Sequence, residues 1–200
     1  VGPLGCNCTV VGDPETGEAV VVDPGGDGPL IKEVLARHKL TRVTAVLHTH
    51  AHIDHVGATQ EICSAFGCLP YLHADDAPLH QALPTPAQLL GIPLPDAVEM
   101  ADLQDNQSHR AGTVELGVMH TPGHTFGSCC FLLEKAGVLL SGDTLFRRGI
   151  GRTDIGGDHP TLIRTIKERL FSLHADIVVV PGHGPPTTVG EEKRFNPFMR

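Results

Sequence analysis

The chain has 200 residues, of which 40 % are hydrophobic and 4 % aromatic, and none is Trp. This length suits one domain with a substantial core and is short for two, so a single domain over residues 1–200 is expected. The net charge of −8 and the lack of a Lys/Arg cluster argue against nucleic-acid binding, and no apolar stretch reaches membrane-spanning length.

Short β-rich runs alternate with helical patterns, and turn signals such as Asp23-Pro24-Gly25-Gly26 bound most of them. In chain order the sequence predicts strands at Asn7–Val11 and Ala19–Asp23, a helix at Pro29–Lys39, a strand at Arg42–Leu47, a helix at His55–Phe66, strands at Leu69–Leu72, Thr113–His120, Cys129–Leu133 and Val138–Leu140, a helix at Pro160–Leu173 and a strand at Ile177–Val180.

Residues 74–110 differ from the rest because five Pro residues interrupt them and a polar stretch, Asp102–Arg110, ends them. The sequence predicts a short helix near Ala77–Leu83 and then an irregular excursion. Such segments in compact domains are often binding loops or lids. An ordinary surface connection is an equal alternative.

The six Cys residues do not predict a disulfide framework in a chain of this length. Cys129 and Cys130 are adjacent in an apolar run, where alternate side chains face opposite ways, and are expected to be small buried hydrophobic residues. No charged-then-apolar leader opens the chain, so cytoplasm is the expected compartment. Because the chain begins at Val1 rather than Met, a few residues before it are expected to be missing or processed. A monomer or homodimer is expected.

Four short clusters of His and Asp each follow a predicted strand, where small-molecule sites in sheet proteins tend to lie. The chain has 13 His residues, and His is the commonest metal ligand among side chains. A hydrolytic metal site needs ligands that leave one coordination position open for water. The clusters are Thr49–His55, Thr121–Thr125, Ser141–Thr144 and Pro181–Gly184.

These clusters supply two ligand sets and a bridge. The predicted ligands are His50, His52 and His124 for one metal ion, Asp54, His55 and His183 for a second, and Asp143 between the two. A bridging Asp is reasonable because a carboxylate has two oxygens to share between two cations. Asp54 and Asp143 are also the predicted catalytic residues. Two divalent ions are expected; Zn, Fe and Mn all suit these donors, and Zn is preferred here.

The string Thr49-His50-Ala51-His52-Ile53-Asp54-His55 resembles the ligand signature of the metallo-β-lactamase fold superfamily, and the later clusters match its remaining motifs in order. The resemblance covers nearly the whole chain, from Asn7 to Phe198. It implies an α/β (α+β) fold, a four-layer αββα sandwich with the two-metal site at one edge of the sheets.

Within the superfamily the chain resembles the glyoxalase II group, the hydroxyacylglutathione hydrolases, in a short single-domain form without a C-terminal helical domain. The match rests on Gly142–Phe146, Pro181–Pro185 and Asn196–Phe198. It implies a thioesterase that cleaves S-acylglutathione-type thioesters with metal-activated hydroxide. No Cys stands at a motif ligand position, unlike in some β-lactamases, which disfavours antibiotic hydrolysis.

The stretch after the Gly-Asp-Thr segment departs from glyoxalase II, which carries a Lys and a Tyr there. This chain has Gly151–Asp154 instead, with Arg152 in place of the Lys. Arg152 is the predicted partner of a substrate carboxylate, and a salt bridge to Asp154 or Asp158 is the alternative. The expected partner is a small-molecule thioester whose thiol half is glutathione or another thiol.

The segment Arg148–Asp154 also resembles persulfide dioxygenases of the superfamily, which use one iron ion on two His and one carboxylate, a donor set suited to O₂ chemistry. The residues that match this triad are His50, His124 and Asp143. Hydrolysis is the primary hypothesis because Val56-Gly57-Ala58 and Gly184-Pro185 resemble hydrolases. Dioxygenation is the alternative, and a metal-stabilised domain without catalysis is disfavoured by the open coordination position.

Overall fold

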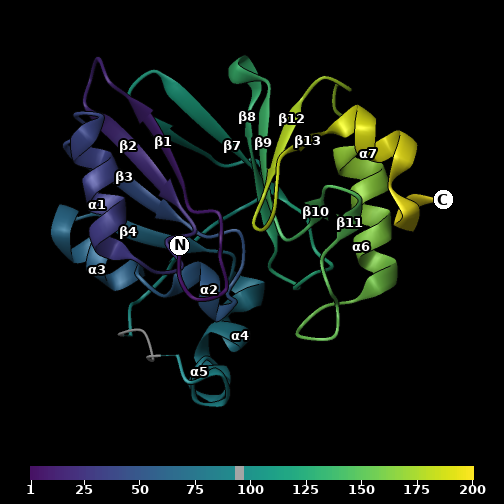
Figure 1. Ribbon diagram of the computed structural model, residues 1–200, viewed down its shortest axis with the longest axis horizontal. Coiled ribbons are helices and arrows are strands. Elements are labelled where there is room, and N and C mark those ends of the chain that lie inside the picture. The colour runs from purple at the N-terminus through teal and green to yellow at the C-terminus, as the bar shows by residue number, and fades with distance from the viewer. Residues whose placement is uncertain (93–96) are drawn as a thin grey trace.

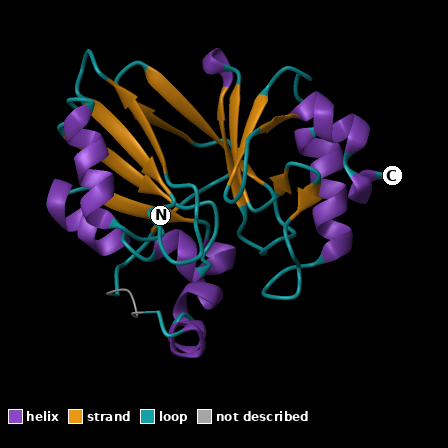
Figure 2. Ribbon diagram, viewed as in Figure 1, coloured by secondary structure: helices purple, strands orange, loops and turns teal. Residues whose placement is uncertain are grey.

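The computed structural model describes residues 1–92 and 97–200. Two β-sheets stand face to face in it, and helices cover their outer sides (Figure 1). Figure 2 shows the order across the molecule as helices, strands, strands and helices. This arrangement confirms the expected four-layer αββα sandwich.

The first sheet is built from the N-terminal half of the chain. Its strands are β1 (Thr9–Asp13), β2 (Glu18–Val22), β3 (Arg42–Leu47), β4 (Leu69–Leu72) and β5 (Ala101–Asp102), in that spatial order. β1 and β2 form an antiparallel pair, whereas β2 to β5 run parallel. The helices α1 (Gly28–Arg37) and α3 (Thr59–Phe66) pack on its outer face through Ile31, Leu35 and Ile62.

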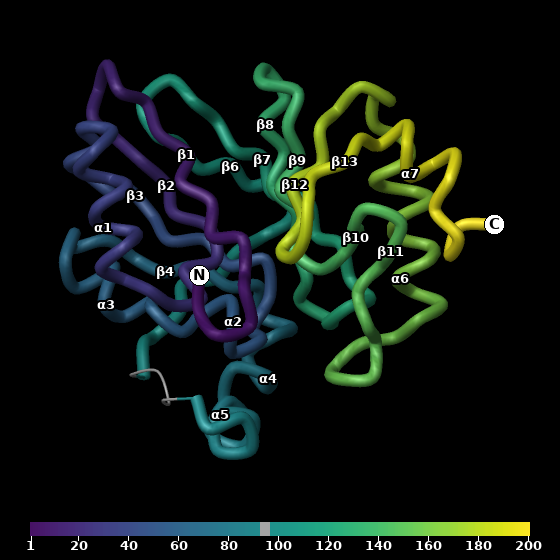
Figure 3. Tube along the Cα trace, in the orientation of Figure 1, coloured from purple at the N-terminus to yellow at the C-terminus, as the bar shows by residue number. Residues whose placement is uncertain are grey.

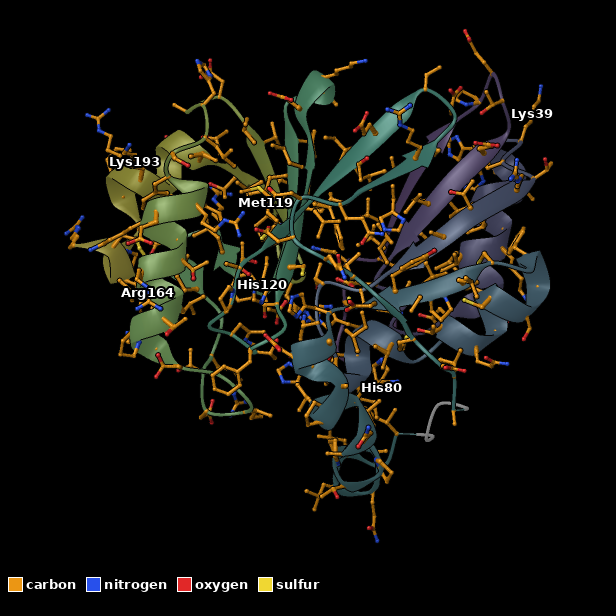
Figure 4. All side chains as sticks on the ribbon, turned by 180° about the vertical axis from the view of Figure 1, so that it is seen from behind. Lys39, His80, Met119, His120, Arg164 and Lys193 are labelled. Carbon is orange, nitrogen blue, oxygen red and sulfur yellow. The ribbon has the colours of Figure 1, made fainter. Side chains whose placement is uncertain are left out.

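The second sheet is built from the C-terminal half. Its strands, in spatial order, are β13 (Thr187–Thr188), β12 (Val178–Pro181), β9 (Val138–Gly142), β8 (Cys129–Leu133), β7 (Val114–His120) and β6 (Ser108–Ala111). Only the β12–β9 pair is parallel. Outside it lie α6 (His159–Thr165), which continues as a π-helical turn over Ile166–Leu170, and α7 (Val189–Phe195). Arg164 and Lys193 mark these two outer helices in Figure 4. A small hairpin, β10 (Leu145–Phe146) and β11 (Gly149–Ile150), follows β9.

The main core lies between the sheets, where Leu47 and Phe131 are fully buried. Cys129 belongs to this inter-sheet core, whereas its neighbour Cys130 packs on the other side against Leu162 and Ile166. Both Cys side chains are 0 % exposed. The prediction that they are buried on opposite faces of one strand is therefore confirmed.

The predicted helix over His55–Phe66 is two helices, α2 (Ile53–Val56) and α3, separated at Gly57 and Ala58. The turn after β2 packs into the break, because the Ala58 amide donates to the Pro24 carbonyl over 2.7 Å. A Cβ on Gly57 would lie 2.4 Å from the Gly25 oxygen, so this close approach requires glycine. Because of the break, α2 does not pack on the outer face of the first sheet as α3 does; it lies at the lower edge of both sheets (Figure 1).

Residues 74–110 are less irregular than predicted. The predicted helix is present as α4 (Ala77–Gln81), and a second helix, α5 (Pro84–Leu90), follows it. The end of the segment forms two strands, β5 and the edge strand β6, which were not predicted because their sequence is polar. Residues 93–96 of the excursion lie outside the described residues.

The N-terminal segment before β1 runs beside α2 and the loop after β12 (Figure 3). The Asn7 amide donates to the Gly182 carbonyl over 2.8 Å, and Cys6 Sγ lies 3.6 Å from His55 Nδ1. The predicted first strand starts two residues late, at Thr9, because Asn7 pairs with this loop instead. Across the described residues, no helix has the length and apolar character to cross a bilayer.

Candidate metal centre

The seven predicted ligands lie in loops at the same end of the two sheets. The loop after β3 and helix α2 carry His50, His52, Asp54 and His55, and the other three follow β7, β9 and β12. The structure therefore brings all seven together, as the positions after strand ends predicted.

Main-chain bonds hold these loops against one another. The Cys129 amide donates to the Thr49 carbonyl over 2.7 Å and so joins the first sheet to the second. The Gly182 amide donates to the Gly142 carbonyl, also over 2.7 Å, which continues the parallel β12–β9 pairing. As a result, Asp143 and His183 stand side by side and face the loop that carries His50.

Two glycines make this approach possible. Gly142 has φ 48°, and a Cβ there would lie 2.5 Å from Thr49 Cβ. A Cβ on Gly182 would lie 2.2 Å from Asp143 Oδ1 and 2.8 Å from His55 Cε1. No side chain fits at either position while the ligands keep their places.

The first ligand set consists of His50, His52 and His124. His124 Nε2 lies 3.2 Å from His50 Nε2 and 3.0 Å from His52 Nδ1. Nitrogen ligands of a tetrahedral zinc ion stand about 3.3 Å apart, since each Zn–N bond is about 2.0–2.1 Å. The spacing of the three nitrogens is thus close to that of a metal site.

The other nitrogen of each ring shows which nitrogen carries the proton. His124 Nδ1 lies 2.6 Å from the Arg152 carbonyl oxygen, and His52 Nε2 lies 3.2 Å from the Ile155 carbonyl oxygen. A carbonyl oxygen can only accept, so both nitrogens donate. His50 Nδ1 donates to Thr49 Oγ1 over 3.0 Å, because that hydroxyl gives its own proton to Asp23.

Three unprotonated nitrogens therefore lie close together, with His124 Nε2 3.0–3.2 Å from the other two. Lone pairs at this distance repel, and a cation between them turns the repulsion into coordination. Burial favours the neutral imidazole form: it lowers the pKa of His124 to about 3, and the pKa of His50 also falls well below its usual value. Neutral His is the form that binds metals.

The second ligand set consists of Asp54, His55 and His183. Asp54 Oδ2 lies 3.0 Å from His183 Nε2 and 3.7 Å from His55 Nε2. His55 Nδ1 donates to Asp23 Oδ2 over 3.0 Å, which turns Nε2 inward. Among the described residues, this buried Nε2 has no hydrogen-bond partner. Burial would lower the pKa of His55, but Asp23 raises it well above its usual value, so Nε2 releases its proton when it binds an ion.

Asp143 lies between the two sets. Its Oδ1 is 3.6 Å from His55 Nε2, and its Oδ2 is 3.8 Å from His124 Nε2 and 3.9 Å from His183 Nε2. Oδ1 is also buried and has no hydrogen-bond partner in residues 1–92 and 97–200. Burial raises the pKa of Asp143 to about 6, so the carboxylate form needs positive charge beside it. Two cations, one on each side, would supply that charge, and the donor set fits them.

Asp54 has the opposite electrostatic environment. Burial by itself would raise its pKa, but the hydrogen bond with His183 and the positive charge of His55 lower the pKa to about 2. The side chain is therefore ionised at neutral pH and available as an anionic ligand. The two predicted catalytic carboxylates differ because only Asp54 has a directly hydrogen-bonded imidazole.

The sequence prediction missed two buried carboxylates that support the ligands. Asp23, 2 % exposed, accepts from the Thr49 amide and hydroxyl over 2.7 Å each as well as from His55. Asp76, 1 % exposed, contacts the loops on either side of the first ligand set. The signal for Asp23 was its place at a strand end in the turn Asp23-Pro24-Gly25; Asp76 stood in the segment assigned as irregular.

Arg152 has its backbone and its side chain in different roles. The backbone carbonyl accepts from His124, whereas the exposed guanidinium forms two hydrogen bonds with Asp154, of 2.7 and 2.6 Å. This is the salt bridge that the sequence left as the alternative. Substrate binding by Arg152 stays a prediction, and it requires the guanidinium to leave Asp154.

Comparison with known proteins gives a family match over most of the chain. A family model described as "Metallo-beta-lactamase superfamily" matches residues 1–183. The uncharacterized protein ML0493 of Mycobacterium leprae is 44 % identical, covering 99 % of this chain and 95 % of its own. Hydroxyacylglutathione hydrolase GloC of Haemophilus influenzae is 37 % identical, covering 96 % of this chain and 92 % of its own.

Solved structures show the same fold. BLEG-1, titled a B3 metallo-beta-lactamase, superposes with a TM-score of 0.90 at 40 % identity, covering 100 % of this chain and 96 % of its own. TTHA1623 in a di-iron-bound form gives 0.88 at 36 % identity, with 99 % and 97 % covered. ETHE1 from Myxococcus xanthus gives 0.78 at 27 % identity, with 95 % and 77 % covered.

Proposed function

Since the chain belongs to the metallo-β-lactamase superfamily, we propose that it is a two-metal hydrolase of the glyoxalase II kind, which cleaves S-acylglutathione-type thioesters. The family match and the His/Asp clusters support a metal-dependent enzyme. The similarity to GloC, named a hydroxyacylglutathione hydrolase, supports the thioester as substrate. The similarity to a di-iron-bound structure supports two ions and leaves iron beside zinc as the metal.

The observation that carries the proposal is that the second ligand set is complete and shares Asp143 with the first. Asp54, His55 and His183 lie together, and both Asp143 oxygens face ligand nitrogens, one from each side. One ion needs only half of these donors. Two divalent ions bound here would lower the pKa of a water molecule toward neutrality and polarise the thioester carbonyl.

The chain's own residues orient the ligands and set their charge. Asp23 keeps the His55 proton on Nδ1, and the Arg152 carbonyl keeps the His124 proton on Nδ1, so Nε2 of each ring faces the centre. Asp54 Oδ2 and both carboxylate oxygens of Asp143 face the same space. A thiolate is a good leaving group, so the reaction needs no strong general acid among these residues.

The proposal is tested by steady-state hydrolysis of a hydroxyacylglutathione together with metal analysis of natively purified protein. We expect about two ions per chain and thioester cleavage that Asp54→Ala or His183→Ala abolishes. A β-lactam belongs in the same assay, because BLEG-1 is titled a β-lactamase. Faster turnover of the β-lactam than of every thioester tried would overturn the thioesterase proposal while leaving a metallohydrolase.

Sulfur dioxygenation by one iron ion is the second candidate. It is favoured by the approach of His50, His124 and Asp143 within the first half of the centre and by the similarity to ETHE1. This triad does not use Asp54 or His183. Asp54→Ala should therefore preserve O₂ uptake with glutathione persulfide if the protein is a dioxygenase. One iron per chain, persulfide-dependent O₂ uptake and no thioester cleavage would establish this candidate instead.

A further inference from the structure

The buried carboxylate of Asp76 binds the two loops that carry His50, His52 and His124, and within the described part of the chain it forms no hydrogen bond with a ligand side chain. We infer that Asp76 is a positioning residue for this ligand set alone, and that it controls metal affinity at this position without affecting the other. The inference rests on the two-ion site proposed above. Asp76 would give the first metal position a structural support that the second position does not share.

Three hydrogen bonds carry the inference. Asp76 Oδ2 accepts from the Ala51 amide and from the Thr125 hydroxyl, each over 2.9 Å, and Oδ1 accepts from the Gly127 amide over 2.7 Å. Ala51 is the residue between His50 and His52, and Thr125 directly follows His124. One carboxylate thus holds a residue adjacent to each of the three ligands of the first set, Ala51 through its backbone amide and Thr125 through its hydroxyl.

Asp76 is closely enclosed, which makes these contacts sensitive to small changes. It is 1 % exposed, and a Cβ on Gly127 would lie 2.6–2.7 Å from Asp76 atoms, so the loop after His124 lies directly against it. Three donors compensate the burial of the charge. Among the described residues, the Asp76 carboxylate forms no hydrogen bond with Asp54, His55 or His183.

Asp23 provides the comparison, because its contacts reach both sets. It accepts directly from His55 and, through the Thr49 hydroxyl, it also orients His50. Loss of Asp23 should therefore weaken both metal positions. Asp76 differs in that its influence ends at the loops of the first set, and this difference can be measured.

The Asp76→Asn substitution keeps the shape of the side chain and replaces one acceptor oxygen by an NH₂ group. That group would face either the Gly127 amide or the pair of donors from Ala51 and Thr125, and donor would then meet donor. The loops would move apart by enough to separate His124 Nε2 from the His50 and His52 nitrogens, which now lie 3.2 and 3.0 Å from it. Residues that support metal ligands in this indirect way typically change metal affinity by about 10–100-fold.

The experiment measures binding of Zn²⁺ alone to metal-depleted protein by calorimetry, in two backgrounds. Asp54→Ala leaves the first set as the intact position, and His124→Ala leaves the second. Adding Asp76→Asn should weaken Zn²⁺ binding about 10–100-fold in the Asp54→Ala background and change it less than about 2-fold in the His124→Ala background. Adding Asp23→Asn should weaken binding in both.

Asp75→Asn is the matched control, because it makes the same chemical change at the neighbouring, exposed residue and should leave Zn²⁺ affinity unchanged. If Asp76→Asn fails to fold by circular dichroism, Thr125→Val removes one of the three donors and should weaken the first position several-fold. Equal weakening in both backgrounds, or none in either, would overturn the inference. A wild-type protein that binds a single ion would overturn the two-ion proposal, and the Asp76 inference would then be judged on that one ion in the Asp54→Ala background.

Discussion

At the scale of the residue, four ligand imidazoles are held by an oxygen on the nitrogen that points away from the centre. For His124 and His52 that oxygen is a backbone carbonyl, of Arg152 and Ile155. A backbone carbonyl is available whatever the side chain, so no sequence pattern could reveal these two contacts. The clustering of the candidate ligands could be predicted because His and Asp side chains carry metal-binding chemistry and follow strand ends. Two of the four oxygens that orient the rings belong to the main chain and could not be predicted.

Gly182 shows how little room the centre has. Gly182→Ala would place a Cβ 2.2 Å from Asp143 Oδ1 and 2.8 Å from His55 Cε1, so the two ligands would have to separate. We expect loss of at least one metal ion per chain and of hydrolysis with the fold retained, measured by metal analysis and circular dichroism. Gly149→Ala is the control, because a Cβ there meets Phe146 Cβ at 3.6 Å, an ordinary contact. Full metal content in Gly182→Ala would contradict this prediction, because it would mean that the loops carrying Asp143 and His55 can move to accommodate the methyl group.

Arg152 can bind a substrate carboxylate only in competition with Asp154, since its guanidinium already forms two hydrogen bonds there. If it binds substrate, Arg152→Ala should raise KM several-fold with kcat unchanged, and Asp154→Asn should lower KM because the guanidinium is freed. Steady-state kinetics with a glutathione thioester measure both. Arg164→Ala, on the outer helix α6 (Figure 4), is the charge-matched control. An unchanged KM in both variants would leave the guanidinium with a structural role only.

At the scale of the element, the predictable parts were those whose apolar residues follow one period. The long strands, α1, and α6 with its continuation match the apolar runs of the sequence. The edge strand β6, Ser-His-Arg-Ala, was not predicted, because a strand at an exposed sheet edge needs no alternation of apolar and polar residues. The break between α2 and α3 was not predicted, because it results from a contact with the turn at Pro24 and Gly25, which is distant in the sequence. Tertiary contacts of this kind leave no local period in the sequence.

Asp105 joins the end of β7 to the outer helical layer. Its Oδ1 accepts from the His120 amide over 2.8 Å and from Arg169 Nη2 over 2.9 Å. Burial alone would raise the pKa of Asp105, but these two donors outweigh it and lower the pKa below its usual value. A carboxyl group with a lowered pKa stabilises the fold above its unfolded pKa of about 3.9, and this contribution is lost as the pH falls through the folded value.

Asp105→Asn should therefore lower the free energy of unfolding by roughly 1 kcal/mol at pH 7, a value kept small because the ion pair is about one-third exposed. The difference from wild type should shrink as the pH falls below about 4. Urea unfolding at pH 7 and at pH 3 measures both quantities. Asp176→Asn, at a largely exposed pair with His174, serves as the control. An equal difference at both pH values would mean that the charge of Asp105 is not what stabilises the junction.

At the scale of the whole molecule, the centre joins two halves of the chain. The first sheet and α2 supply His50, His52, Asp54 and His55, whereas the second sheet supplies His124, Asp143 and His183. Each ligand set takes residues from both halves. Any ion bound in either set therefore links the two sheets at their lower edge, in addition to the apolar core between them. Metal binding should be visible in the stability of the entire fold and not only at the loops.

Metal removal provides the test at this scale. An ion that binds only the folded chain stabilises it by about 2.7 kcal/mol at a free concentration one hundred times its Kd, and for a chain of this size each ion should raise Tm by roughly 5–10 °C. We expect thermal unfolding to begin lowest in chelator-treated protein and Tm to rise steadily with the logarithm of the Zn²⁺ concentration. The double variant Asp54→Ala/His124→Ala lacks one ligand from each set, and its Tm should respond far less. If Tm rises equally in the double variant, the ion stabilises the protein from somewhere other than this centre; if it does not rise in wild type, no ion joins the two halves.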